Sequence, residues 1–225
     1  MSPEKRITKA QMKQDKMVSF ALKAGEYIQQ RKNYFLYGAI GVAGIILIIF
    51  FIRYTINKKN QEAVDIFGRA QLASAMNQNA LAITDYKNVL DEYGSAAVAG
   101  RACFFLAESY VRQRNYDSAA IFYQQFIDDY SKDKFLLPAA YAGGGDANEQ
   151  QQQYGKAAEL YLKAAEIAND DYRSPDYYLA AGRNFALAGH YDQAKQAYQR
   201  IIDKYRRSAA YSEARKKIAE IEYRN

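Results

Sequence analysis

The 225-residue chain has 31 Lys and Arg residues against 25 Asp and Glu residues, and 21 Tyr but no Trp. A single Cys, Cys103, permits no internal disulfide, so it is expected to be a small buried hydrophobic side chain. Residues 1–59 hold 11 basic and three acidic residues, whereas residues 60–225 hold 20 basic and 22 acidic residues. A basic excess confined to the N-terminal part argues against a nucleic-acid-binding domain and favours a charge that orients a membrane protein.

Residues 1–33 are predicted to form a basic amphipathic helix that leads into a membrane span. Apolar residues recur there at helical spacing, and basic residues such as Lys16 and Lys23 lie between them. The apolar positions are Met17, Phe20, Ala21, Ala24, Tyr27 and Ile28. Such a helix either lies on the lipid surface and steadies the anchor or docks a membrane partner, and both roles stay open.

Residues 34–52 form a run of 19 residues without a charged side chain. An α-helix of that length spans the roughly 30 Å hydrocarbon core of a bilayer. Basic residues flank the run on both sides: Arg31, Lys32, Arg53, Lys58 and Lys59. A cleaved signal peptide is disfavoured, because the run is too long for a signal core and no small-residue cleavage site follows it. Residues 53–62 are expected to form either a juxtamembrane linker or an extension of this transmembrane helix.

The orientation of the span is predicted from the surrounding charges. Four Lys or Arg residues lie within 20 residues on each side of the run, and four more lie further towards the N-terminus. A large domain can cross a membrane largely regardless of its charge. We therefore expect the N-terminal segment in the cytoplasm and the large C-terminal part outside it. A reversed topology, which would make the protein a cytoplasm-facing receptor, stays open.

From residue 63 the sequence repeats at intervals of 37 or 38 residues. Four segments share the pattern Ala-x-x-x-Tyr within an amphipathic helix: residues 79–93, 116–130, 154–168 and 191–205. The paired positions are Ala82 and Tyr86, Ala119 and Tyr123, Ala157 and Tyr161, and Ala194 and Tyr198. A second predicted helix precedes each segment and carries small residues of its own, among them Ala107, Gly145 and Gly182.

The pattern resembles the tetratricopeptide repeat, in which helix pairs stack because one pair cannot bury its apolar face alone. The resemblance implies an all-α solenoid of about four helix pairs over residues 63–207. The expected pairs are residues 63–95, 100–132, 138–171 and 175–207, followed by a capping helix at residues 208–225. It also implies that the small residues lie where two helices approach closely, with the Tyr beside them. The absence of Trp and the long spacing depart from the usual repeat.

No group of residues in the sequence indicates catalysis, a metal site or a cofactor, so we expect a protein that is not an enzyme. The glycines at residues 143–145 lack the Lys-Ser/Thr of a phosphate-binding loop. His190 has no second His and no Cys near it in the sequence. Glu108, Asp146 and Glu149 are interpreted as charges on a solvated helix face.

The resemblance further implies a protein-binding groove lined by the first helix of each pair. Its candidate side chains are both apolar and charged: Phe67, Gln71, Phe104, Glu108, Val111, Arg112, Asp146, Glu149, Leu179, Arg183 and Leu187. Repeat domains of this family that clamp a C-terminal carboxylate use Asn and Lys at these places. The Asn positions here hold Gln71, Glu108, Asp146 and Arg183, which departs from that mode of binding.

The order of basic segment, single span and repeats resembles the ancillary subunits of the bacterial SecYEG translocon. That resemblance implies a single-pass protein of the bacterial inner membrane whose repeats face the periplasm. Its implied partners are the lipid bilayer, the Sec translocon, and exported polypeptides or periplasmic chaperones, with no nucleic acid and no cofactor. The alternative is a repeat protein that serves assembly, cell division or coordination of the cell envelope.

Overall fold

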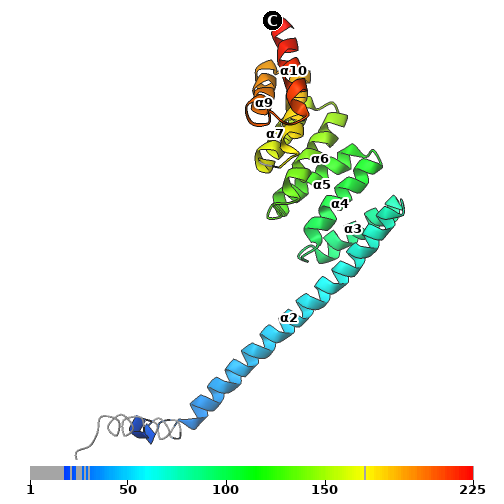
Figure 1. The fold of residues 1–225 in the computed structure, drawn as a ribbon. Coiled ribbons are helices and arrows are strands. Elements are labelled where there is room, and N and C mark those ends of the chain that lie inside the picture. The colour runs from blue at the N-terminus through cyan, green and yellow to red at the C-terminus, as the bar shows by residue number, and fades with distance from the viewer. Residues whose placement is uncertain are drawn as a thin grey trace, which may run out of the picture. The chain divides into compact units, whose positions relative to one another are not determined.

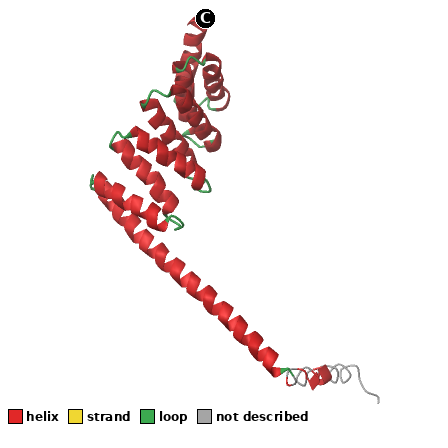
Figure 2. Ribbon diagram, turned by 180° about the vertical axis from the view of Figure 1, so that it is seen from behind, coloured by secondary structure: helices red, strands yellow, loops and turns green. Residues whose placement is uncertain are grey.

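The computed structural model describes residues 18–20, 22, 23, 27, 29, 31–169 and 171–224. These residues form helices joined by short loops, and no strand occurs among them (Figure 2). The all-α class predicted from the sequence is therefore confirmed. Most of the predicted amphipathic helix at residues 1–33 lies outside the described residues.

Helix α2 is one continuous helix of 44 residues from Lys32 to Ala75. It includes the predicted span at residues 34–52, the predicted linker or helix extension at residues 53–62 and the first predicted repeat helix. Contacts divide the protein into two compact units, residues 1–57 and 58–225, and α2 contributes to both. Within the first unit, the large apolar and aromatic side chains between Leu36 and Ile56 are 51–69% exposed. Among the described helices, α2 is the one long and apolar enough to cross a membrane.

The second unit is a row of helix pairs (Figure 1). After α2 come α3 (Asn79–Tyr93), α4 (Ala99–Arg112), α5 (Tyr116–Asp129), α6 (Leu137–Gln150), α7 (Tyr154–Ala168), α8 (Ser174–Leu187), α9 (Tyr191–Lys204) and α10 (Ala210–Arg224). Helices α2, α4, α6 and α8 are the first helices of the pairs, and α3, α5, α7 and α9 are the second helices. Each helix packs against the next one in sequence, from α3 through to α10.

In every pair, a loop of three residues joins the first helix to the second helix. The middle residue of each loop has a positive φ. The four middle residues are Asn77, Arg114, Gln152 and Gly189, with φ between 57° and 81°. This left-handed conformation costs a non-glycine residue steric strain, and only Gly189 adopts it freely. The recurrence of the same left-handed turn in all four pairs shows that the sequence period is also a structural period.

Small residues on the first helices let tyrosines of the second helices come very close. A Cβ atom added to Gly182 would lie 2.4 Å from Cε1 of Tyr198, and one added to Gly145 would lie 3.0 Å from the ring of Tyr161. Both tyrosine rings are buried. Real Cβ atoms do not come as close as 2.4 Å to another heavy atom, so a larger residue at Gly182 requires the backbone or the ring to move.

The glycines at residues 143–145 are part of this packing. They lie inside α6, where the backbone is helical, so they do not form a phosphate-binding loop. A Cβ atom on Gly143 would lie 2.3 Å from Cζ of Tyr123, which belongs to the preceding pair. Helix α6 is therefore close to tyrosines of both neighbouring second helices, α5 and α7.

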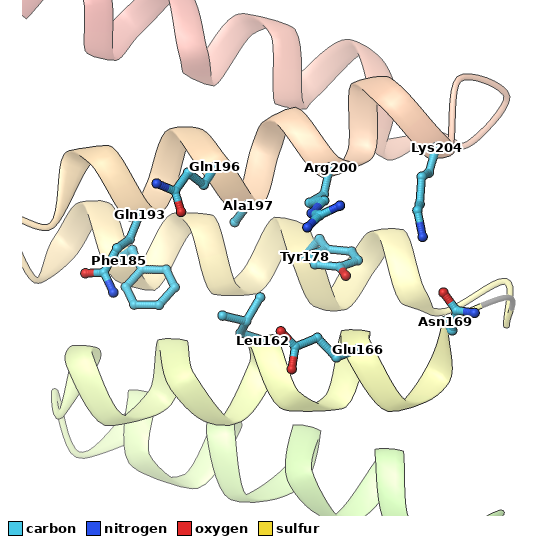
Figure 3. A pocket seen from close by; sticks show the side chains of 10 residues that line it. All are labelled: Leu162, Glu166, Asn169, Tyr178, Phe185, Gln193, Gln196, Ala197, Arg200 and Lys204. Atoms are coloured by element: carbon cyan, nitrogen blue, oxygen red, sulfur yellow. The ribbon is translucent and has the colours of Figure 1, made fainter.

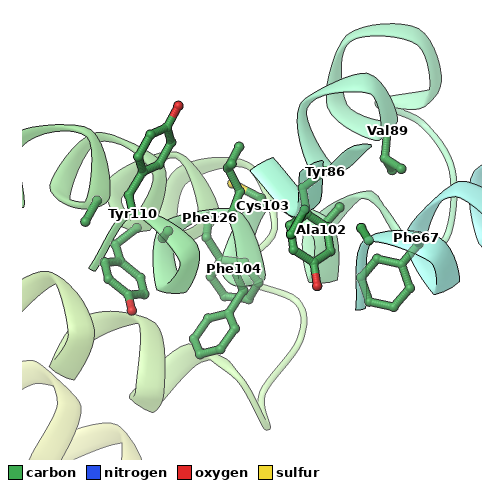
Figure 4. Packing of buried hydrophobic residues seen from close by; sticks show 14 of the residues in the cluster. Phe67, Tyr86, Val89, Ala102, Cys103, Phe104, Tyr110 and Phe126 are labelled. Atoms are coloured by element: carbon green, nitrogen blue, oxygen red, sulfur yellow. The ribbon is translucent and has the colours of Figure 1, made fainter. Parts of the chain in front are cut away.

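Alanines and aromatic rings fill the core of the repeat unit, and Figure 4 shows its first half. The alanines of the repeat pattern are completely buried: Ala82, Ala107, Ala119, Ala157 and Ala194. The ring of Phe104 meets the rings of Tyr123 and Phe126 edge-on, each with centroids 5.9 Å apart. Cys103 is fully buried beside them, as predicted, and burial raises the pKa of its thiol to about 12.

Candidate functional site

The first helices of the pairs lie side by side and are joined by polar contacts. On α4, Arg112 donates a hydrogen bond of 2.7 Å to Oγ of Ser74 on α2. On α8, Arg183 donates to both carboxylate oxygens of Glu149 on α6, each at 2.9 Å. We call the surface that these helices share the first-helix face. Of the predicted groove residues, nine are exposed or half-exposed: Gln71, Glu108, Val111, Arg112, Asp146, Glu149, Leu179, Arg183 and Leu187.

The two phenylalanines predicted to line the groove are instead buried. Phe67 is 5% exposed and Phe104 is 7% exposed. Phe67 packs against the ring of Tyr86 at 5.8 Å between centroids, and Phe104 packs between rings of the same core. These two side chains therefore support the first-helix face from within and do not form part of its surface.

Three carboxylates occupy the middle of the first-helix face. The hydroxyl of Tyr123 donates to Glu108, and Nδ2 of Asn184 donates to Glu149 at 2.8 Å. Asp146 lies between these groups and forms no ion pair with another described residue. Burial raises the pKa of Asp146, and the nearby charges of Glu149 and Glu108 raise it further.

The cations of the face do not neutralise this centre completely. Arg183 forms an ion pair with Glu149, whereas Arg112 donates hydrogen bonds to the hydroxyls of Ser74 and Ser109. The middle of the first-helix face is consequently acidic, which favours a partner that presents basic or hydrogen-bond-donating groups.

A pocket of about 200 Å³ lies at the C-terminal end of the first-helix face. Its lining combines apolar and charged side chains from α8, α9 and α10: Arg183, Ala186, Leu187, Tyr191, Tyr198, Lys217, Glu220 and Ile221. Leu187 is 54% exposed, so an apolar side chain of a partner could contact it without any rearrangement. Helix α10 therefore provides one wall of this pocket as well as covering the end of the stack.

Several of these residues were not identified from the sequence. Lys217 and Ile221 of the capping helix both line the pocket, and the sequence pattern did not single them out. Tyr123 was assigned to packing alone, although its hydroxyl also holds Glu108. Asn184 precedes the buried Phe185 and shows no sequence signal for its bond to Glu149, which lies 35 residues away.

The face has the chemistry of a binding surface. It offers carboxylates, guanidinium groups and a pocket lined by apolar and charged side chains, a mixture typical of protein–protein contacts. In the described part of the protein, no three His, Cys, Asp or Glu side chains lie close enough together to hold a metal ion. His190 immediately precedes α9, and its imidazole faces the ring of Phe185 with centroids 6.4 Å apart.

Comparison with known proteins identifies the repeats. Residues 67–134 and residues 176–208 each match a family described as tetratricopeptide repeat. No curated protein matches the sequence. Two stretches of the repeat unit therefore match the tetratricopeptide repeat, in agreement with the sequence pattern.

Solved structures show the same fold. A tetratricopeptide repeat protein from Parabacteroides merdae is similar with a TM-score of 0.60 and 12% identity over 73% of this chain, which spans only 61% of that protein. A structure of MamA is similar with a TM-score of 0.53 and 20% identity, covering 73% of this chain and 87% of that one. MamA from AMB-1 gives a TM-score of 0.54 and 15% identity over 72% and 82% of the two proteins. These likenesses concern the fold alone.

Proposed function

We propose that this protein is a membrane-anchored scaffold that binds other proteins on the first-helix face of its repeat unit. The observation that carries this proposal is the row of first helices, which places an acidic centre and a pocket of mixed apolar and charged lining on one surface. Tetratricopeptide arrays bind proteins through extended surfaces of this kind. The chemistry of the face, with no catalytic group placed on it, favours a binding function over an enzymatic one.

The proposed anchor is the first part of α2. Its apolar side chains are more than half exposed, and such a surface is unfavourable in water. A bilayer would cover it, because a helix of about 20 apolar residues matches the hydrocarbon core. The basic N-terminal segment would then remain in the cytoplasm and the repeats would lie outside it.

The more specific proposal names the partner. The order of basic segment, span and repeats supports an ancillary subunit of the bacterial Sec translocon, with the repeats in the periplasm. There the first-helix face would hold exported polypeptides or periplasmic chaperones. Its acidic centre suits segments of exported polypeptides that carry Lys or Arg.

A pair of photo-crosslinking variants tests the binding face. A photoreactive phenylalanine analogue replaces Leu187, which is 54% exposed in the pocket, or Ile121, which is 64% exposed on the second helix α5. In cells, the analogue at Leu187 is expected to form discrete protein adducts, and the analogue at Ile121 is not. Equal adducts from both positions, or none from Leu187, would contradict the assignment of the face.

The identities of the crosslinked proteins also distinguish between the candidate partners. Translocon subunits, exported polypeptides or periplasmic chaperones in the Leu187 adducts would support the translocon proposal. Division or envelope-assembly proteins would instead support a scaffold for that machinery and overturn the translocon assignment. Co-purification in mild detergent gives the matching control, because translocon subunits should accompany the protein only in the first case.

A further inference from the structure

A second groove lies between the second helices α7 and α9 and uses none of the residues of the first-helix face. Its cavity has a volume of about 350 Å³, in the range of ligand pockets. Figure 3 shows α9 on one side, α7 on the other, and Tyr178 and Phe185 of α8 between them. Both rings line the cavity and are almost completely buried.

The two ends of this groove differ in chemistry. The amides of Gln193 and Gln196 lie at one end, and the cations of Arg200 and Lys204 lie at the other (Figure 3). Neither cation forms an ion pair with an acid among the described residues. Since they are four residues apart on one helix, both project along the same face.

The negative charge of the single carboxylate that lines the groove is balanced by a lysine. Glu166 on α7 accepts a hydrogen bond of 3.0 Å from the ammonium group of Lys163, outside the groove lining. The charge near Arg200 and Lys204 is therefore positive overall. An anionic group of a ligand would find two donors there, and guanidinium and ammonium groups both bind carboxylates.

The length of the groove indicates the kind of ligand. From Gln193 to Lys204 the lining of α9 extends over 11 residue steps, which is about 16 Å along a helix. An extended peptide of about five residues covers that distance at about 3.3 Å per residue. Side-chain amides such as those of Gln193 and Gln196 pair with peptide N–H and C=O groups.

We propose that the groove between α7 and α9 binds a short extended peptide with a carboxylate at the end that meets Arg200 and Lys204. The carboxylate comes from Asp or Glu side chains or from the C-terminus of a polypeptide. This site is separate from the first-helix face and would let the scaffold hold a second, acidic partner at the same time.

Fluorescence anisotropy of a labelled peptide tests the proposal with the full-length protein in detergent. The probe is Leu-Ala-Leu-Asp-Asp with an amidated end. It is compared with Leu-Ala-Leu-Asn-Asn that has a free C-terminal carboxylate, and with the amidated form of that peptide, which has no carboxylate. Binding of either acidic peptide but not of the uncharged one supports the proposal and identifies the source of the carboxylate. Equal binding of all three, or of none, overturns it.

Charge variants locate the binding. The double variant R200Q/K204Q should weaken binding by at least about tenfold, since two charge-assisted contacts are lost. The matched double variant R215Q/K216Q removes the same charges from exposed positions on α10 and should bind normally. Glu166→Gln should tighten binding, which no general loss of folding could mimic. Equal weakening by both double variants, or weaker binding by Glu166→Gln, would overturn the assignment.

Discussion

Replacing Phe126 with Ala is expected to lower the free energy of unfolding of the repeat unit by about 3–5 kcal/mol. Phe126 lies on α5 and is completely buried. Its ring packs edge-on against Phe104 at 5.9 Å and lies 6.3 Å from the ring of Tyr130. Removing it leaves a cavity among rigid rings that cannot collapse easily, so both the transfer free energy and the packing contacts are lost.

Phe135 is the matched control for this substitution. It is 79% exposed in the loop between α5 and α6, so Phe135→Ala should change the free energy of unfolding by less than about 0.5 kcal/mol. Urea unfolding of both variants, followed by circular dichroism at the helix band, measures the difference. Similar midpoints for the two variants would show that α5 does not pack in the core as described.

Replacing Gly182 with Leu is expected to have the second large effect on the free energy of unfolding. This substitution adds volume to the core, whereas Phe126→Ala removes volume from it. The first added atom already falls 2.4 Å from the ring of Tyr198, which is 1% exposed and held by the core. Overpacking of this kind costs about 1–3 kcal/mol, because helices α8 and α9 must separate. The thermal midpoint of the full-length variant should fall accordingly.

A substitution at Gly68 provides a control that is expected to raise the stability instead of lowering it. A Cβ atom at Gly68 meets nothing within 4 Å, and the residue lies inside α2. Gly68→Ala should therefore raise stability by about 0.5–1 kcal/mol, because Ala restricts the unfolded state and favours the helix. If Gly182→Leu were as stable as the unaltered protein, the close approach of α8 to Tyr198 would be wrong.

Arg183 illustrates a contact that could not be predicted from the sequence. The sequence placed it among the candidate groove side chains and indicated no partner for it. In the structure it pairs with Glu149, whose side chain is only 19% exposed, so Arg183→Ala would also leave a partly buried carboxylate without its cation. The two residues are 34 positions apart, and helical periodicity carries no information about such pairs.

The class of fold was predictable because the same local pattern occurs four times. Amphipathic periodicity and Ala-x-x-x-Tyr identify helices, and recurrence at a fixed interval identifies stacking. The boundary between core and surface was less predictable. Phe67 and Phe104 fall on first helices, but the way neighbouring pairs stack decides that these rings face inward.

The junction between anchor and repeats follows one of the two alternatives that the sequence left open. Residues 53–62 carry several charges and were expected to form either a linker or an extension of the helix, and they are helical as part of α2. Nothing in this stretch breaks a helix, since it lacks Pro and Gly. The span could be predicted from its composition, and the lack of a helix-breaking residue in residues 53–62 is consistent with the uninterrupted helix.

The membrane orientation of the repeats is the claim on which the proposed function depends most directly. A C-terminal alkaline phosphatase fusion to the full-length protein should be active, and a C-terminal green fluorescent protein fusion exported through the Sec pathway should be dark. Protease added to spheroplasts should degrade the repeats and spare the N-terminal segment. A fluorescent fusion with an inactive phosphatase fusion and protected repeats would place the domain in the cytoplasm and contradict the periplasmic scaffold.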